Sequence, residues 1–154
     1  LVSTALLHGD WIHVGVNAVM LWQFGMRPAR VLGPGIAGAG KWMFLFVVSI
    51  AAGSLVYLML QGVNGGVAVG ASGGTCGLIA ADFLIGRDGR IRSPLSRPFL
   101  LLTLYFALIN LALVYLVPLV LPFYVSWQAH LGGYLAGVAM MLILGPKART
   151  AEAA

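Results

Sequence analysis

The sequence predicts an all-α bundle of membrane-spanning helices, and three observations lead to this fold class. Of the 154 residues, 60% are hydrophobic and only 8% are charged, whereas soluble domains carry about 25% charged residues. The apolar residues gather in five blocks, and all charged residues except Asp82 lie outside these blocks. The blocks approach the length of about 20 residues that a helix needs to cross a bilayer. A nucleic-acid-binding domain is disfavoured, because the net charge of +5 forms no basic face.

The five predicted helices are separated by Gly, Pro and charged residues. Their approximate bounds are 12–26, 42–60, 71–86, 99–121 and 128–144. The first and third blocks are shorter than a full span. We expect neighbouring helices to shield them from lipid, which is tolerated where the backbone lines a cavity inside the protein.

The basic residues predict which ends of the helices face the cytoplasm. They follow the first, third and fifth blocks, and the other two connections carry no charge. The three groups are Arg27, Arg30 and Lys41, then Arg87, Arg90, Arg92 and Arg97, then Lys147 and Arg149. Because cytoplasmic loops are enriched in Lys and Arg, we expect the N-terminal end of the chain outside and its C-terminal end inside. We therefore predict a multi-pass membrane domain over residues 1–146, with one further helix before it, and a cytoplasmic tail over residues 147–154.

Ser72 lies in the stretch GASGG at positions 70–74, at the predicted start of the third helix. A hydroxyl group in apolar surroundings costs free energy unless it is paired or hydrated. Gly70 and Gly73 permit a tight turn into the helix, and the unpaired N–H groups of a helix N-terminus can stabilise an oxyanion. Ser72 is therefore a candidate nucleophile. A helix cap or a small-residue packing surface is the alternative interpretation.

His130 opens the last apolar block and is followed by Gly133 and Gly137. These two glycines share one face of a helix, because residues four apart stack, and a Gly-x-x-x-Gly surface lets another helix approach closely. If the helix of Ser72 is that partner, the imidazole and the hydroxyl meet. A serine with a histidine is the minimum set for covalent acyl chemistry. The alternative is an ordinary histidine at the membrane interface.

The helix rise predicts that the candidate residues lie at one depth. Ser72 precedes Arg87 by about 15 residues and His130 precedes Lys147 by about 17, or roughly 22 and 25 Å at 1.5 Å per residue. Both lie about 5–8 Å below the outer edge of a hydrocarbon layer about 30 Å thick. His13 shares this level.

His13 and Asn17 are four residues apart, so they share one face of the first helix. Both side chains can donate hydrogen bonds toward a developing negative charge, and polar contacts between helices are the alternative. His8 and Asp10 are expected in a loop. A zinc site of His8, His13 and His130 is disfavoured, because the spacing lacks the H-E-x-x-H pair of metalloproteases. We therefore expect no metal and no cofactor.

Three further residues receive structural interpretations. Asp82 lies near the inner end of the third block, about 15 Å from Ser72 along the helix, so we expect an interfacial ion pair rather than a catalytic acid. Asn110, in the middle of the fourth block, is expected to hold helices together. Cys76 is expected to pack in the interior, and as the single cysteine it excludes an internal disulfide bond.

Taken together, three motifs resemble those of the rhomboid family of intramembrane serine proteases, in the family's order. The segment HGDWIHVGVN at 8–17 is similar to the entry to the family's second helix, GASG at 70–73 to its nucleophile motif, and AHLGGYLAG at 129–137 to its sixth helix. The similarity covers nearly the whole chain except its charged tail. It implies that the chain supplies the second to the sixth core helices of a rhomboid-like bundle.

The resemblance also implies roles. Ser72 would attack the scissile carbonyl, and His130 would take its proton and later give it to the leaving amine. Asn17, His13 and the backbone N–H groups of Ser72 and Ala71 would hold the oxyanion. The implied partners are transmembrane protein substrates within the lipid bilayer, and the implied location is a bacterial inner membrane.

Two positions depart from the family's pattern. The family often has an aromatic residue one turn after the nucleophile, where this chain has Cys76, and an acidic residue after the second helix is replaced by Ala29. Two rival functions remain open. One is a rhomboid-like pseudoenzyme that binds membrane clients without cutting them, and the other is a small transporter whose polar residues line a path.

Overall fold

The computed structural model describes residue 2 and residues 11–62, 70–120 and 125–146, and this part of the chain is all-helical apart from one bridge between Ile85 and Ile91. The helices are α1 (Trp11–Leu32), α2 (Gly35–Gln61), α3 (Ser72–Leu84), α4 (Arg97–Val120) and α5 (Trp127–Leu144). The predicted fold class is therefore confirmed. The expectations for His8, Asp10 and the tail at 147–154 lie outside the described residues.

Three of the described helices, α2, α4 and α5, are long and apolar enough to cross a membrane. The shortest helix is α3, whose 13 residues rise about 20 Å. It is shielded as expected, because every residue from Gly73 to Asp82 is buried. The first helix is longer than predicted and continues through Pro28 to Leu32. A single proline inside a helix removes one backbone hydrogen bond, and Pro28 is itself buried in the bundle.

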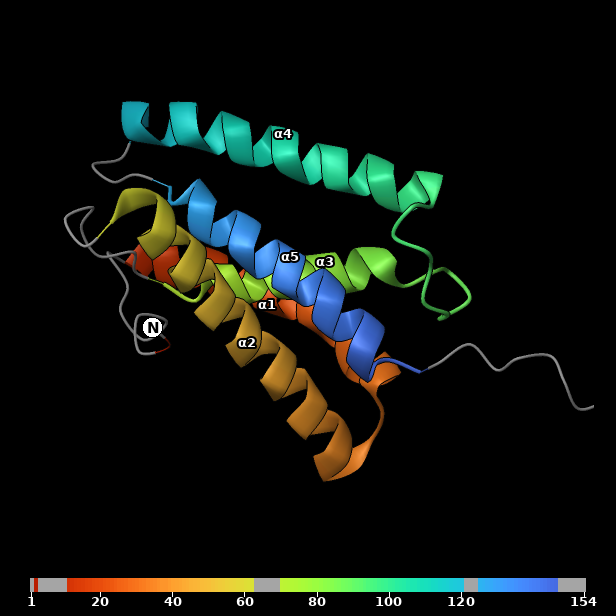
Figure 1. Ribbon diagram of the computed structural model, residues 1–154. Helices are drawn as coiled ribbons and strands as arrows, with labels where there is room; N and C mark the ends of the chain where they lie inside the picture. Colours follow the sequence, from red (N-terminus) through yellow and green to blue (C-terminus); the bar gives the residue numbers. More distant parts are fainter. Residues whose placement is uncertain (1, 3–10, 63–69, 121–124, 147–154) are drawn as a thin grey trace, which may run out of the picture.

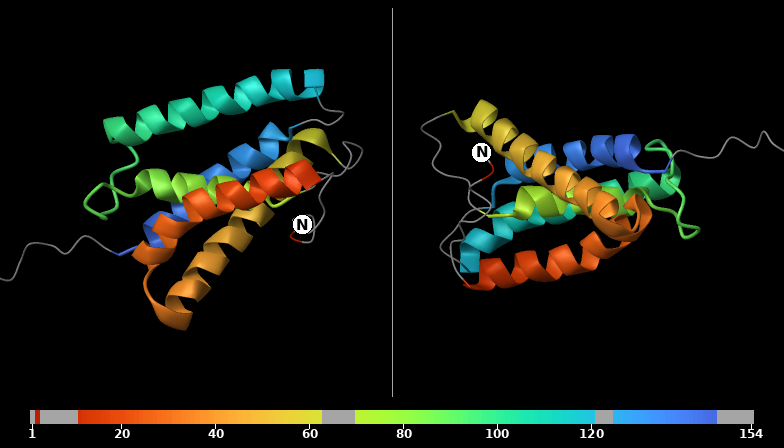
Figure 2. Two further views of the ribbon diagram at one scale, coloured as in Figure 1. Left: turned by 180° about the vertical axis from the view of Figure 1, so that it is seen from behind. Right: turned by 90° about the horizontal axis from the view of Figure 1, so that it is seen from below.

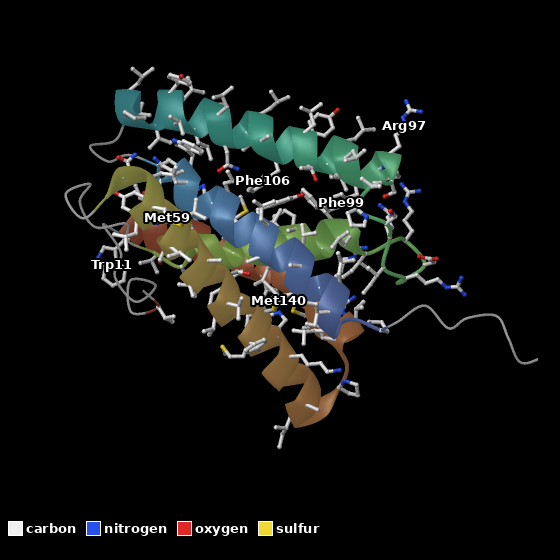
Figure 3. The ribbon with its side chains drawn as sticks, viewed as in Figure 1. Trp11, Met59, Arg97, Phe99, Phe106 and Met140 are labelled. Atoms are coloured by element: carbon white, nitrogen blue, oxygen red, sulfur yellow. The ribbon has the colours of Figure 1, made fainter. Side chains whose placement is uncertain are left out.

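The helices alternate in direction, with α1, α3 and α5 running one way and α2 and α4 the other (Figures 1 and 2). In these views α3 occupies the centre, packed between α1, α2 and α5, while α4 lies along the outside of the bundle. The α1–α2 turn, which has basic residues in the helices on both sides, and the α3–α4 connection, which carries three arginines, lie at the same end as the C-terminus of α5. Arg97 lies at this end and Trp11 and Met59 at the opposite end (Figure 3). This is the arrangement that the spacing of the basic residues predicts.

Glycines allow the backbones of α3 and α5 to touch. A Cβ atom added to Gly133 would collide with the carbonyl oxygen of Gly73, and one added to Gly137 would collide with that of Gly77. The structure thus brings together the Gly-x-x-x-Gly face of α5 and the helix that begins at Ser72. The other side of α5 approaches α2 as closely, because a Cβ atom on Gly53 would lie 2.5 Å from the carbonyl oxygen of Ala129.

Helix α4 presents most of its surface to the surroundings. Phe99 is its one buried residue, and large apolar side chains such as Leu104, Tyr105 and Leu116 are more than half exposed. Figure 3 shows Phe99 and Phe106 turned from α4 toward α5, where both rings stack on Tyr134. A helix with one inward stripe and an apolar remainder is suited to contact lipid.

An ion pair joins α1 to α3 at the end that carries the basic connections. The guanidinium of Arg27 donates to both carboxylate oxygens of Asp82, at 3.1 and 3.2 Å, and to the carbonyl oxygens of Ile85 and Gly86, at 3.0 and 3.2 Å. The expected ion pair of Asp82 is present, and its partner is Arg27 rather than the neighbouring, exposed Arg87. Arg27 therefore also bonds the carbonyl groups of the two residues that follow α3.

We expect Arg27→Gln to lower the free energy of unfolding by about 1–3 kcal/mol, between the values typical of exposed and of buried ion pairs. The side chain of Arg27 is 42% exposed and that of Asp82 only 11%. Asp82→Asn should cost less, because it removes the buried charge and leaves the bonds of Arg27 to two carbonyl groups. Unfolding by SDS in mixed micelles measures the free energy of unfolding of both variants. Arg90→Gln, at an exposed pair with Asp88 of 3.9 Å, is the control, and equal effects of Arg90→Gln and Arg27→Gln would contradict the prediction.

Candidate active site

Ser72 is the first residue of α3 and is half-buried. The turn that leads to it depends on Gly70, whose φ of 107° favours glycine. The carbonyl oxygen of Ala71 accepts hydrogen bonds from the backbone N–H and the hydroxyl of Thr75, at 3.0 and 3.2 Å. These bonds fix the entry into the helix. The first N–H groups of α3 have no intrahelical acceptor, and the N-cap residue Ala71 makes no side-chain hydrogen bond to them.

His13 and Asn17 of α1 face this turn. A Cβ atom added to Gly70 would lie 2.8 Å from both Cε1 and Nε2 of His13 and 3.8 Å from Nδ2 of Asn17. Asn17 is buried, and its Nδ2 donates to the carbonyl oxygen of His13 at 2.9 Å. The amide nitrogen has a second hydrogen to donate. Two potential donors to an oxyanion thus lie beside the residues that precede Ser72.

His130 lies in the first turn of α5, which packs against the first turn of α3. Its neighbour Ala129 has its carbonyl oxygen 3.5 Å from the Cβ position of Gly73, and Gly133, one turn later, touches Gly73 directly. The structure therefore gathers the start of α3, the start of α5 and one face of α1 at one end of the bundle.

Nδ1 of His130 is 2.6 Å from Oδ1 of Asn110 on α4. Sequence reasoning assigned Asn110 to helix packing alone, and the contact is indeed between helices. Its partner, however, is the candidate base. The signal available in the sequence was the spacing of Thr103 and Asn110, which are seven residues apart and therefore share a helix face. Only the packing of α4 on α5 reveals which residue that face meets.

Comparison with known proteins assigns a family to this arrangement. Residues 1–147 match the model of the Rhomboid domain. The chain belongs to the rhomboid family. A curated relative, RHOMBOID-like protein 5 from Arabidopsis thaliana, is 33% identical over 155 residues, which cover 96% of this chain and 45% of the relative. The chain therefore spans less than half the length of that relative.

The predicted family is thus confirmed, and so is the predicted rhomboid-like helical bundle of an integral membrane protein. The bacterial inner membrane and the cytoplasmic C-terminus stay predictions, since the relative is a plant protein. Cys76, at the position where rhomboids often have an aromatic residue, is buried in the core and carries a free thiol. Among the described residues, no three His, Cys, Asp or Glu side chains are grouped closely enough to hold a metal ion.

Gly70→Ala tests whether the turn before Ser72 positions His13. The added Cβ atom would require the imidazole to move, and a misplacement of about 1 Å can lower a rate by about 100-fold. We expect the reaction of Ser72 with a fluorophosphonate to slow by roughly 10- to 100-fold. Gly33→Ala is the matched control, because Gly33 has a similar φ of 113° and no atom within 4 Å of its Cβ position. Equal reaction rates for the two variants would contradict the prediction.

Proposed function

We propose that this rhomboid protein is an intramembrane serine protease that cleaves transmembrane segments of other membrane proteins with a Ser72–His130 dyad. The observation that carries the proposal is the backbone contact of Gly73 with Gly133. Ser72 immediately precedes the first of these glycines, and His130 lies one turn before the second. Two side chains at these positions belong to adjacent turns of adjacent helices. Their residue types are those that acyl transfer requires.

In the proposed reaction, His130 takes the proton of the Ser72 hydroxyl while Oγ attacks the scissile carbonyl carbon. The resulting oxyanion accepts hydrogen bonds from the Asn17 amide, His13 and the backbone N–H groups of Ser72 and Ala71. His130 then gives its proton to the leaving amine, and the acyl group stays on Ser72. A water molecule, deprotonated by His130, releases the second product and restores the hydroxyl.

The position of the site limits its substrates. A peptide bond within a helix is shielded, because its carbonyl oxygen accepts the N–H of a residue four positions later. A transmembrane substrate must therefore unwind locally before Ser72 can reach a carbonyl carbon. We place the site near the outer face of the membrane, since the basic connections at the opposite end favour the cytoplasm.

We expect a fluorophosphonate to label the full-length protein in detergent and to leave Ser72→Ala unlabelled, because the hydroxyl oxygen is the proposed nucleophile. Ser126→Ala, which removes the hydroxyl at the N-cap of α5, is the control and should be labelled like the wild type. Absence of wild-type labelling, or equal labelling of Ser72→Ala, would refute the proposed protease activity. Client binding without any cleavage product would then indicate a pseudoenzyme, and solute flux that depends on His13 and His130 would indicate a transporter.

Asn17→Ala should lower kcat by about 100- to 1,000-fold and leave KM within about twofold, because an oxyanion donor acts mainly in the transition state. Cleavage of a transmembrane reporter in proteoliposomes separates the two constants. Gln23→Ala removes an exposed amide from the same helix and should change neither. A rise in KM at constant kcat would assign Asn17 to substrate binding instead.

A further inference from the structure

Helix α4 contacts α5 through two polar side chains that lie on its inward stripe. The hydroxyl of Thr103 is 2.6 Å from the hydroxyl of Tyr134. Oδ1 of Asn110, two turns further along α4, is 2.6 Å from Nδ1 of His130. The Thr103–Tyr134 hydrogen bond joins the two helices and needs no further role, since neither residue belongs to the candidate active site. The second contact ends on the residue that we propose as the base.

The direction of the Asn110–His130 hydrogen bond follows from a third group. Nδ2 of Asn110 donates to the backbone carbonyl oxygen of Phe106 at 2.9 Å. A carbonyl oxygen can only accept, so the nitrogen of the amide must face Phe106 and the oxygen must face His130. An amide oxygen is also only an acceptor, and Nδ1 of His130 must therefore carry the proton. In a neutral imidazole, this leaves the lone pair on Nε2.

We propose that Asn110 is a positioning residue that holds His130 in the Nδ1–H tautomer, with Nε2 free to accept the proton of Ser72. The inference rests on the proposed function and adds a third member to its dyad. Asn110 itself touches neither the nucleophile nor the scissile bond. It acts through the ring orientation and the tautomer of the base.

A neutral amide is the acceptor that the surroundings favour. A carboxylate in the same place would have to be buried in an apolar bundle, at a high free-energy cost. The buried carboxylate that α3 does contain, Asp82, is paired with Arg27 at the opposite end of that helix. An amide orients the imidazole but adds no negative charge to stabilise an imidazolium ion. Its removal leaves both neutral tautomers accessible rather than imposing the wrong one, so it should cost less than the roughly 10⁴-fold loss that follows when a triad histidine takes the wrong tautomer.

The test compares Asn110→Ala with Thr103→Val, each of which removes one hydrogen bond between α4 and α5. We expect Asn110→Ala to lower kcat for a transmembrane reporter in proteoliposomes by about 10- to 100-fold, with KM within about twofold. Thr103→Val should retain kcat within about twofold. If both bonds only hold α4 in place, the two variants will lose activity alike, and that result would overturn the inference.

A second measurement reads the tautomer directly and does not depend on turnover. In full-length protein labelled with ¹⁵N-histidine, nitrogen chemical shifts distinguish Nδ1–H from Nε2–H, and loss of a signal in His130→Ala assigns the ring. We expect the Nδ1–H form in the wild type and in Thr103→Val, which leaves the Asn110 amide in place. The exclusive Nδ1–H form should be lost in Asn110→Leu.

The outcomes separate this inference from the protease itself. An active wild type whose Asn110→Ala variant keeps full kcat, or an Nε2–H tautomer in the wild type, overturns the role of Asn110 and leaves the dyad in place. An inactive wild type that fluorophosphonate does not label overturns the dyad, whatever the tautomer. If Asn110→Ala fails to fold, the tautomer of His130 in the wild type and in Asn110→Leu decides.

Discussion

The contact between the backbones of α3 and α5 is the constraint on which the remaining structure depends. It requires glycine at facing positions, because a single methyl group at Gly133 or Gly137 would meet a carbonyl oxygen of the other helix. Apolar burial drives such contacts poorly within lipid, where side chains are as well solvated as in the protein, so close packing has to supply the attraction. The same contact sets how far apart the backbones at Ser72 and His130 lie, so the geometry of the proposed dyad follows from the packing of the two helices.

The polar side chains at the two ends of α3 lie beside other polar groups, as an apolar solvent favours. The Arg27–Asp82 ion pair closes one end of α3, and the Gly70 turn with His13 and Asn17 surrounds the other end. Between them α3 is buried almost completely although it is too short to span a bilayer. The short central helix can begin below the membrane surface because α1, α2 and α5 enclose it. Its N-terminal N–H groups are thereby directed into protein rather than into lipid.

Much of this arrangement was predictable from the sequence, and the exceptions have physical reasons. Five apolar blocks, with basic residues after the first, third and fifth, predicted five helices of alternating direction, and the glycine spacing after His130 predicted a close helix contact. The length of α1 was underestimated, because Arg27 and Pro28 look like a helix end and only their tertiary partners show why the helix continues. The contact of Asn110 with His130 was not predicted, for a related reason. The periodicity of α4 shows which residues share its inward face, but a nearly uniform apolar sequence does not show how far that helix is rotated or shifted against α5.

The exposed position of α4 has a consequence for the proposed base. This helix brings the acceptor for Nδ1 of His130, yet most of its circumference is open to acyl chains. A change in bilayer thickness is met in part by a change in the tilt of such a helix. Tilting α4 by a few degrees alters a hydrogen bond whose strength depends steeply on distance and angle. The lipid mixture around the protein would thereby influence the proposed proton transfer through the tilt of α4, even though no lipid atom takes part in the reaction.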